Sequence, residues 1–448
     1  MTEETRRDGG AEDGRPPKVV IVGGGFAGFQ AARSLAKRMG DEVDIILVSP
    51  TNYFLYLPLL PEVAAGILDP RRVTVSIPGT LRKVRLLLGS VESVRLEEKQ
   101  LTYVDPEGDR GELSFDRVLL TTGSVNKLLP IPGVAKYAHG FRNIAEALYL
   151  RDHITRQIEL ADNTDDPEER AARLTFVVVG AGYTGTEVTA QGALMTKALC
   201  KEHPRLAGQR ARWLLVDTAP RVLPGLGESL SRTADRVLRQ RGVEIRTQTS
   251  VAEAMDDCVR LSDDTVVPTR SLIWCVGVRP EPLISGLGSP TTKGRIDVDE
   301  YLQVPGHDHV FACGDVAAVP DLTRPGEITP MTAQHAQRQG VRAALNIAAS
   351  FGIGERRPYE HHDLGFVVDL GGWTSAADPL HIPLSGLPAK VVARGYHLYS
   401  LPGNRGRTAA SWLTETAFGR QGVQLGLVRG KDVPLDTDTP MGAVTPNP

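Results

Sequence analysis

The feature that most constrains this chain is a glycine-rich turn that occurs twice. The first copy, GGGFAG, occupies residues 23–28, and the second, GAGYTG, occupies residues 180–185. Each copy follows a short apolar run typical of a buried strand, at Lys18–Val22 and at Leu174–Val179, and each opens a segment with helical spacing. The two copies therefore predict two large βαβ units of the same design.

Within each turn the three glycines have separate tasks. The first permits the tight bend, the second lets the backbone approach a pyrophosphate, and the third lets helix and strand pack closely. The helix that follows carries free N–H groups and roughly half a positive charge at its start, which favours a phosphate there. We expect these roles for Gly23, Gly25 and Gly28 in the first turn and for Gly180, Gly182 and Gly185 in the second.

The residue that ends the second strand of each unit distinguishes the two copies, because an acid at this place holds ribose hydroxyls. In the first unit Ser49 follows the strand Val43–Val48, and a hydroxyl does part of that work more weakly. In the second unit Asp217 follows the strand Trp213–Val216 and also repels a 2′-phosphate, which favours NADH over NADPH. Arg221, close by, is expected to be a solvated surface arginine that keeps this preference moderate.

Two such units imply two dinucleotides, and FAD held permanently with NADH visiting is the natural pair. A chain of 448 residues is long enough for two or three domains. We expect an α/β fold of two Rossmann-like domains followed by a C-terminal region that attaches to a membrane or forms a dimer. The predicted boundaries are residues 18–141 with 290–358 for the FAD-binding domain, 142–289 for the NAD-binding domain and 359–432 for the C-terminal region.

The segments around the two units complete the expected organisation. The acidic stretch Leu160–Glu169 predicts an exposed loop, and polar composition predicts disordered tails at residues 1–17 and 433–448. Further strands are expected at Leu86–Glu97, Gln100–Val104, Asp116–Leu120 and Val310–Ala312, and helices at Ala27–Arg38, Thr186–Leu199 and Thr332–Phe351.

Composition excludes several classes of protein. A net charge of −3 gives no indication of nucleic-acid binding. The four scattered cysteines predict neither a disulfide framework nor a zinc site, and His361 and His362 lack a third metal ligand. The N-terminus lacks the apolar core of a signal peptide, and no apolar run is long enough for a transmembrane helix.

The order of the remaining motifs resembles the two-dinucleotide-domain flavoprotein superfamily over most of residues 18–350. TTGS at 121–124 is similar to the superfamily's crossing segment, and IWCVGVRP at 273–280 to its return from the NAD domain. FACGD at 311–315 is similar to the second FAD fingerprint, whose Asp meets the ribityl chain. The resemblance implies FAD contacts from Gly123, Gly314 and Asp315, and an NAD contact from Gly277.

Within that superfamily the chain most resembles type II NADH dehydrogenases, which are single-subunit, non-pumping NADH:quinone oxidoreductases. Residues 52–61, including Tyr53, are similar to a segment that lies beside the flavin in that family, and some members also have Ser-Pro in place of the strand-end acid, as at Ser49-Pro50 here. TGTEV at 184–188 implies a place for Glu187 in the nicotinamide and quinone region. AQHA at 333–336 resembles the start of the quinone-site motif and implies a place for Gln334 near the flavin ring.

The quinone motif also departs from the family at one position. The fuller motif has a second Gln where this chain has Arg338, with Gln339 one place later. Three roles stay open for Arg338: pairing with an acidic group, donating to a quinone carbonyl, or blocking the tunnel. The expected catalytic residues are Glu187 and Gln334, and the expected quinone contacts are Gln334, Arg338 and Tyr53.

Each of these residues also has a purely structural interpretation. Glu187 suits the first turn of a helix, where the dipole favours an acid by roughly 0.3–1 kcal/mol. Asp315 suits a helix N-cap, and Gln334 suits a solvated helix face. The resemblance favours the functional interpretation of all three, whereas we expect His335 to be structural.

The resemblance implies hydride transfer from NADH to FAD, followed by transfer of two electrons to a membrane quinone, with menaquinone the expected one. The alternative is a soluble diaphorase or ferredoxin-type reductase with another acceptor. Sulfide:quinone and disulfide reductases are disfavoured because no redox cysteine pair is evident. A non-catalytic FAD-bearing sensor is disfavoured because the residues of both turns are intact.

The C-terminal region contains two predicted amphipathic helices, at Leu387–Leu401 and Thr408–Phe418. A basic stripe on the first and an apolar side on the second suit the anionic cytoplasmic face of the cell membrane, with Trp412 at the headgroup level. Packing of both helices on the protein or on a second subunit, as in a homodimer, is the alternative. The stripe consists of Lys390, Arg394 and His397, opposite Val391, Val392, Leu398 and Tyr399, and the apolar side of Trp412, Leu413 and Phe418.

Overall fold

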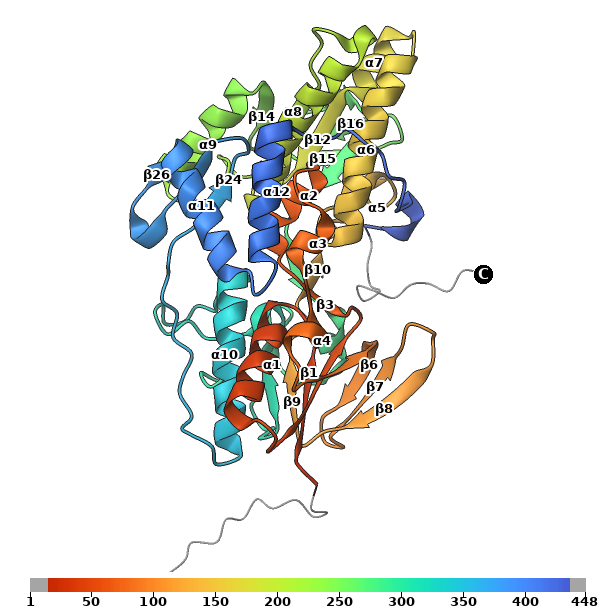
Figure 1. Cartoon of the computed structure of the whole chain (residues 1–448). Coiled ribbons are helices and arrows are strands. Elements are labelled where there is room, and N and C mark those ends of the chain that lie inside the picture. The colour runs from red at the N-terminus through yellow and green to blue at the C-terminus, as the bar shows by residue number, and fades with distance from the viewer. Residues whose placement is uncertain (1–14, 436–448) are drawn as a thin grey trace, which may run out of the picture.

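Two five-stranded parallel sheets form the framework of the molecule, one in each lobe of Figure 1. The computed structural model describes residues 15–435. The first sheet has the order β22-β9-β1-β2-β5 and the second the order β11-β18-β12-β13-β14. The first comprises β1 (Lys18–Val22), β2 (Asp44–Ser49), β5 (Arg85–Leu88), β9 (Arg117–Leu120) and β22 (Val310–Ala312). The second comprises β11 (Ala138–Gly140), β12 (Thr175–Val179), β13 (Arg212–Val216), β14 (Val243–Arg246) and β18 (Ser271–Trp274).

The central strands β1 and β12 are almost wholly buried, which is why their sequences are continuous apolar runs and do not alternate. Each leads through its glycine turn into a helix, α1 (Phe26–Met39) or α8 (Tyr183–Glu202), and then into the neighbouring parallel strand. The two predicted βαβ units are confirmed. The predicted strand at residues 310–312 is also confirmed, and it joins the first sheet beside β9.

Long helices cover the sheets. In the first lobe α10 (Ala333–Ser350) packs along α1, and their axes approach so closely that a Cβ on Gly340 would lie 2.2 Å from the Ala27 carbonyl oxygen. Thr332 caps α10, as its side chain accepts a hydrogen bond from the His335 N–H. The second lobe carries α6 (Ile144–Asn163), α7 (Pro167–Arg173), α8 and α9 (Glu228–Gln240).

Smaller sheets, antiparallel except for the pairing of β21 (Arg295–Asp297) with β23 (Ala317–Ala318), lie beside the main sheet of each lobe (Figure 1). In the first lobe these are β6 (Ser90–Arg95), β7 (Gln100–Val104) and β8 (Arg110–Ser114), the pair β3 (Tyr53–Leu55) and β4 (Thr74–Ser76), and the sheet of β20 (Thr291–Thr292), β21 and β23. The second lobe has β15 (Val251–Ala254), β16 (Cys258–Leu261) and β17 (Val266–Pro268). The pair β10 (Ser124–Asn126) and β19 (Val278–Pro280) joins the two crossing segments between the lobes.

Two sequence predictions in this part of the chain are wrong. The single strand expected over residues 86–97 is broken at Gly89 into β5 and β6, which belong to different sheets. A Cβ on Gly89 would lie 2.7 Å from the Val104 carbonyl oxygen, so the bend requires glycine. The loop expected over residues 160–169 is largely helical, because Asp166 caps α7 and Pro167 opens it, which leaves only residues 164–166 between α6 and α7.

Short helices lie in the connections between strands. They are α2 (Leu60–Ala64), α3 (Pro70–Val73), α4 (Ile77–Thr80) and α5 (Val134–Tyr137). Although α2 follows β3 of the first lobe, it packs against α6 and α8 of the second, which places it between the lobes in Figure 1.

The C-terminal region forms a small sheet, β24 (Val367–Asp369), β25 (Ser375–Ala377) and β26 (Leu384–Ser385), followed by α11 (Gly386–Ser400) and α12 (Arg405–Phe418). Both predicted helices are present and lie across the front of the molecule in Figure 1. No helix within residues 15–435 is long and apolar enough to cross a membrane.

The orientation predicted for these helices is wrong in an informative way. Lys390 and His397 of the predicted outward basic stripe are buried, whereas Val391 and Tyr399 are 65% and 79% exposed. On α12, Trp412 is buried, while Leu413 and Phe418 point outward and are 72% and 86% exposed. The charged face turns inward because buried carboxylates lie beneath it, as described below.

The parts of the predicted tails at residues 1–14 and 436–448 lie outside the described residues. Just before the second of these, Val433 and Leu435 are buried, and Leu435 joins the apolar cluster of the second lobe.

Candidate functional site

In the first glycine turn the two outer glycines are tightly packed, whereas the middle glycine has no neighbouring described atoms on its Cβ side. Gly23 has a φ of +105°, and a Cβ there would lie 2.5 Å from the Thr121 carbonyl oxygen. A Cβ on Gly28 would lie 1.9 Å from the Gly23 carbonyl oxygen, whereas one on Gly25 would meet no described atom within 4 Å. The outer glycines are therefore required by the fold itself, and the middle glycine faces free space at the start of α1.

The second turn repeats this construction. Gly180 has a φ of +102°, and a Cβ there would lie 2.3 Å from the Cys275 carbonyl oxygen; one on Gly185 would lie 1.8 Å from the Gly180 carbonyl oxygen. A Cβ on Gly182 again meets no described atom within 4 Å. Gly25 and Gly182 are the N-caps of α1 and α8, and no described side chain caps either helix. Both helix starts therefore keep N–H groups that can donate hydrogen bonds to an anion.

The strand-end residues lie against their turns. Ser49 is buried, with its Oγ 2.8 Å from the place of a Cβ on Gly24. Asp217 accepts hydrogen bonds from the N–H groups of Ala181 and Ala219, the latter at 2.7 Å, so its carboxylate is fixed beside the second turn. The prediction of a solvated Arg221 is wrong, because its guanidinium donates to the carbonyl oxygens of Pro224 and Leu226.

The crossing segments and the Gly-Asp turn meet the first helix start. Ser124 donates to the Asp315 carboxylate at 2.7 Å, and a Cβ on Gly314 would lie 3.2 Å from the Cβ of Ala27 in α1. Asp315 is not a helix N-cap, since the short turn at residues 314–316 begins after Cys313. Gly123 and Gly277 have φ values of +79° and +96°, and a Cβ on either would meet no described atom within 4 Å.

Glu187 lies in the second turn of α8 and not in the first turn expected from the sequence, because the helix already begins at Tyr183; its carboxylate accepts a hydrogen bond of 2.7 Å from the Asp369 N–H. Part of the side chain is still exposed, but protein atoms surround the carboxyl group closely. This loss of solvation, together with the charges of Asp369 and Glu62, raises the pKa of Glu187 well above its usual value. Such a carboxyl group keeps its proton to a higher pH than an ordinary glutamate.

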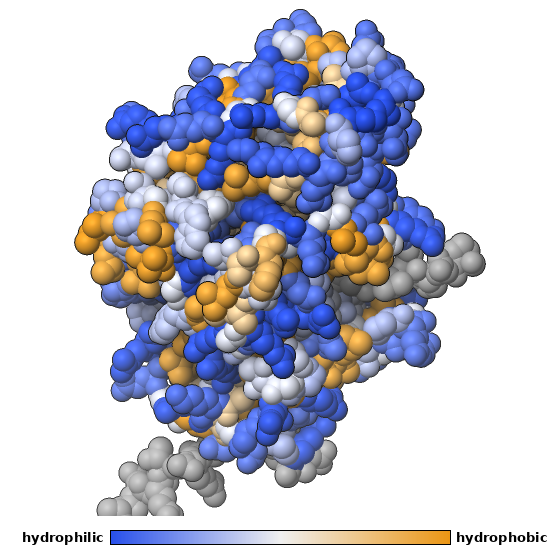
Figure 2. Space-filling view, turned by 45° about the horizontal axis from the view of Figure 1, so that its top comes forward, coloured by the Kyte–Doolittle hydropathy of each residue, from blue (hydrophilic) through white to orange (hydrophobic). Residues whose placement is uncertain are grey.

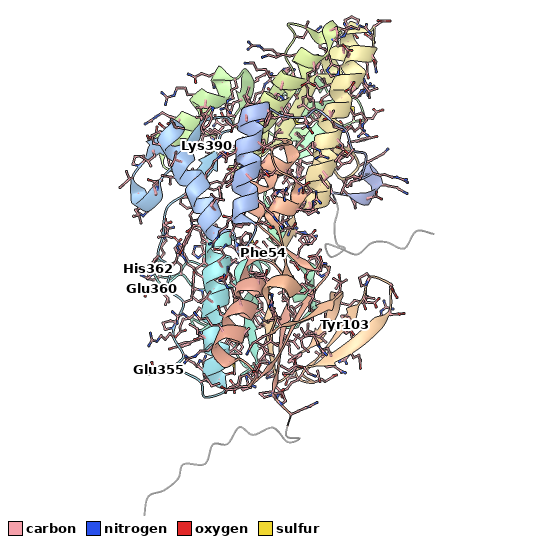
Figure 3. The ribbon with its side chains drawn as sticks, in the orientation of Figure 1. Phe54, Tyr103, Glu355, Glu360, His362 and Lys390 are labelled. Carbon is pink, nitrogen blue, oxygen red and sulfur yellow. The ribbon has the colours of Figure 1, made fainter. Side chains whose placement is uncertain are left out.

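Behind Glu187 lies a buried charge network formed by Glu62, Asp369 and Lys390, which are drawn from α2, β24 and α11. Both Asp369 oxygens lie 2.7 Å from the Lys390 Nζ. Burial acts to raise the pKa of Asp369, but Lys390 outweighs it and lowers the pKa. Burial and the nearby Asp369 raise the pKa of Glu62 to about 7. Figure 3 labels Lys390 on α11, above Phe54 of β3.

Two further contacts bind the C-terminal helices to the same network. The Trp412 indole N–H donates to the Glu62 carboxylate, and the Arg394 guanidinium stacks over the Trp412 ring at 4.4 Å. The Tyr56 hydroxyl lies 3.1 Å from Nδ1 of His397. These partners explain why Lys390, His397 and Trp412 turn inward.

Two residues of the predicted quinone motif, Gln334 and Arg338, contact the segment that follows α10. Gln334 donates to the Gly365 carbonyl oxygen at 2.8 Å, while its buried Oε1 has no hydrogen-bond partner among the described residues. Arg338 contacts Nδ1 of His361 at 3.2 Å and the His362 carbonyl oxygen, so it binds this segment and pairs with no described acidic group. His362 lies beside α10 in Figure 3.

The neighbouring residues have structural roles. His335 is buried and hydrogen-bonded to the Tyr359 hydroxyl at 2.9 Å, as its structural interpretation predicted. Gln339 accepts from the Gly314 N–H at 2.8 Å and donates to Thr329. Tyr53 is half-buried, and burial raises its pKa. No group of three metal-ligating side chains occurs within residues 15–435.

Sequence reasoning missed the buried charge network. The signal was present in two places: Glu62 interrupts the most apolar stretch of the chain, and Lys390 lies among apolar residues of a predicted helix. A charge in such a position is rarely buried without a partner, but the sequence does not identify Asp369 as that partner.

Comparison with known proteins places this geometry in a family. The model of the pyridine nucleotide-disulphide oxidoreductases matches residues 17–340, so the fold and the two turns define an oxidoreductase of that class. The type II NADH:quinone oxidoreductase Ndh of Mycobacterium tuberculosis is 32% identical over 430 residues, which cover 92% of this chain and 90% of that protein. A second such enzyme from that organism, NdhA, is 31% identical over 90% of this chain and 87% of its own length. The chain therefore belongs to the type II NADH:quinone oxidoreductase family, as its motifs indicated.

The fold agrees with a solved structure. NDH2 from Plasmodium falciparum, solved in complex with NADH, superposes with a TM-score of 0.84 at 20% identity and covers 91% of this chain and 100% of that one. The expected α/β fold with two Rossmann-like units is confirmed.

Proposed function

We propose that this enzyme oxidises NADH through a bound FAD and passes two electrons to a membrane quinone, with menaquinone as the natural acceptor. The observation that carries the proposal is the pair of matched turns, each with a middle glycine facing free space at an uncapped helix start. Membership of the family supports the same reaction. Since NADH brings one proton equivalent with its electron pair, forming the quinol takes one further proton from water.

FAD fits the first lobe. The pyrophosphate would lie at Gly25 and the start of α1, with Ser49 toward the ribose. Gly123, Gly314 and Asp315 would face the ribityl chain, since the Gly-Asp turn already lies against α1. When bound, FAD supplies the redox chemistry, as it takes up a hydride and releases electrons singly or in pairs.

NADH fits the second lobe in the same manner. Its pyrophosphate would lie at Gly182 and the start of α8, with Gly277 facing it across the turn. The fixed carboxylate of Asp217 would accept hydrogen bonds from the ribose hydroxyls and repel a 2′-phosphate. We further propose residues 18–141 with 290–358 as the FAD-binding domain and residues 142–289 as the NAD-binding domain. The return of β22 to the first sheet supports this split, but β11 (Ala138–Gly140) pairs with β18 of the second sheet and moves the first boundary to before residue 138.

Glu187 and Gln334 are the proposed catalytic residues. Glu187 would hold the proton that the quinol requires, because burial raises its pKa and so favours the protonated carboxyl group. The unpartnered Oε1 of Gln334 is a free acceptor at the start of α10, and Tyr53 is a further polar group for the quinone. Arg338 is already engaged by His361 and His362 and would reach a quinone only after releasing them.

The exposed apolar faces of α11 and α12 support peripheral attachment to the cytoplasmic face of the cell membrane. Figure 2 shows hydrophobic residues gathered at several places on the side of the molecule that carries these helices. Lipid contact would come from the apolar side chains, in place of the basic stripe that the sequence suggested. The same faces are suited to a homodimer, and we propose residues 359–432 as the attachment region.

An anaerobic experiment tests the proposed reaction. NADH is mixed with the yellow protein and the flavin absorbance is followed, after which a menaquinone analogue is added. Rapid bleaching followed by rapid recovery supports the quinone reductase. Bleaching with no quinone-dependent recovery would overturn the acceptor and favour a diaphorase or ferredoxin-type reductase.

A further inference from the structure

A pocket of about 350 Å³ opens between α9 and the C-terminal sheet, and none of its lining residues belongs to either glycine turn. We call it the α9–α11 pocket. Its described lining is basic and hydroxyl-bearing, with no acidic side chain. It consists of Thr233, Arg236, Val237, Gln240, Arg241, Thr374, Ser385 and Gly386.

The arginines of this pocket differ from their neighbours on α9. Arg232 pairs with Glu228, and Arg239 pairs with Asp235 at 3.0 Å. Arg236 and Arg241 form no ion pair with any residue in 15–435. The pocket therefore contains two cationic groups without a counter-charge, which attracts an anion.

Arg241 is also held in place. Its Nη2 donates to the Gly371 carbonyl oxygen at 2.9 Å, and its other terminal nitrogen, Nη1, is buried without a described partner. The charges that act on it from neighbouring elements are Asp369, which is already paired with Lys390, and Arg420. An anion in the pocket would supply the missing counter-charge, and a fixed guanidinium loses little freedom on binding it.

The start of α11 adds donors to the same pocket. Gly386 is the first residue of this 15-residue helix, and the Ser385 side chain does not cap it among the described contacts. Gly386 lines the pocket together with three hydroxyl-bearing residues, Ser385, Thr374 and Thr233, of which Thr233 already donates to the Ser229 carbonyl oxygen. Hydroxyl, guanidinium and helix-start N–H groups are the donors that bind phosphate.

Apolar side chains flank these donors. Trp373, next to Thr374, is 63% exposed, and Leu387, next to Gly386, is 54% exposed. Leu380 and Ile382 of the β25–β26 connection are exposed as well. Figure 2 shows a hydrophobic patch at the left edge of the molecule, where β26 and the start of α11 lie in Figure 1. A phosphate that carries hydrocarbon chains matches this arrangement better than a free phosphate.

We propose that the α9–α11 pocket binds the phosphate of an anionic phospholipid headgroup, with Trp373 and Leu387 entering the interfacial region beside it. The proposal rests on the membrane attachment proposed above and names the lipid class that this attachment prefers. Because neither arginine lies at a glycine turn, lipid selection is separable from the oxidoreductase reaction.

The test uses the full-length, FAD-loaded enzyme in vesicle sedimentation. Vesicles of phosphatidylcholine alone are compared with vesicles that also contain phosphatidylglycerol. Arg236→Gln should weaken binding to the phosphatidylglycerol vesicles by about fivefold, the effect of one basic residue near an anionic surface. The matched control Arg110→Gln removes the same charge from the exposed β8 strand and should leave binding unchanged. Turnover of Arg236→Gln with a water-soluble quinone in detergent should equal that of the wild type.

Other outcomes overturn the proposal. Equal weakening by both substitutions would show a general charge effect without a pocket. Binding of glycerol 1-phosphate that depends on Arg236, with vesicle binding unchanged by Arg236→Gln, would assign the pocket to a free phosphate compound. Loss of quinone turnover in wild-type enzyme would count against the proposed function, whereas lipid preference would still be measured by sedimentation.

Discussion

The two βαβ units share one construction of the glycine turn, and two corresponding positions outside the turns differ in charge. Ser49 ends the second strand of the first unit where Asp217 ends that of the second. Two residues beyond the last glycine, the first helix has Gln30 and the second has Glu187. The first unit, with neutral Ser49 and Gln30, is assigned to the permanently bound FAD. The second unit, with acidic Asp217 and Glu187, is assigned to NADH, which binds and leaves in each turnover. The fold thus provides the phosphate site twice, while selection and proton handling come from single side chains.

The largest expected effect comes from disturbing the shared construction. A Cβ at Gly28 or at Gly185 would collide with the preceding turn in the same way, and each alanine substitution should destabilise its lobe by about 1–3 kcal/mol. Gly28→Ala should yield protein depleted of flavin, whereas Gly185→Ala should retain flavin but not be reduced by NADH. The flavin-to-protein absorbance ratio and anaerobic reduction measure this. Flavin loss in Gly185→Ala alone would reverse the assignment of the two lobes.

Exchanging the second differing position tests whether proton handling belongs to one unit. Glu187→Gln should lower kcat about a hundredfold, the lower range for a general acid or base, with flavin content unchanged. Because the pKa of Glu187 is raised, the pH profile should lose an inflection above the usual Glu range. The matched variant Gln30→Glu should leave kcat and the profile as they are. An unaltered profile in Glu187→Gln would exclude the proton role.

The first differing position governs dinucleotide choice. Asp217→Ala should reduce the preference for NADH over NADPH, measured as the ratio of kcat/KM values, by about tenfold, since one charge-assisted hydrogen bond and one repulsion are lost. Asp263→Ala, an exposed acid of the same lobe, serves as the control. An unchanged ratio would mean that Asp217 only stabilises the turn, through its hydrogen bonds with Ala181 and Ala219.

Glu62, the buried acid behind Glu187, should make the free energy of unfolding depend on pH. Because the pKa of Glu62 is raised to about 7, the folded state binds more protons than the unfolded state once the pH exceeds the ordinary Glu value. Stability should therefore fall as pH rises toward 7, by at most about 1.4 kcal/mol per pH unit. Glu62→Gln should flatten this slope in urea titrations at several pH values, and an unchanged slope would assign it to other groups.

The smallest effect is expected at Ser49. Ser49→Ala should weaken FAD binding only about fivefold, as one neutral hydrogen bond is lost. Titration of the flavin-free protein with FAD measures it. A loss of FAD affinity as large as the tenfold change predicted for Asp217→Ala would remove the contrast between the two units.

Much of this framework could be predicted from the sequence, because glycine turns, buried strands and helix periodicity are local properties. The βαβ units follow from Lys18–Val22 and Leu174–Val179 and their turns. The helix α7 carried a local signal as well, an Asp-Pro pair at its start, which the acidic composition obscured.

The orientation of the C-terminal helices could not be predicted in this way. Helical periodicity identified opposite faces of α11, but which face is buried depends on Asp369 of the preceding sheet and on Glu62, which lies far away in sequence. Lysine and histidine are ordinarily outward-facing, and only a partner supplied by the tertiary structure reverses that preference. The same holds for Arg338, whose partners His361 and His362 lie on the segment beyond α10.

The insertion of α2 between α6 and α8 limits the modularity of the molecule. This helix is encoded within the first unit but completes the apolar packing of the second. A graft of residues 142–289 from a relative with another dinucleotide preference would leave its docking surface for α2 unmatched. When the second unit is exchanged between such enzymes, α2 must therefore be exchanged with it. Sequence changes in the two units are coupled through this helix.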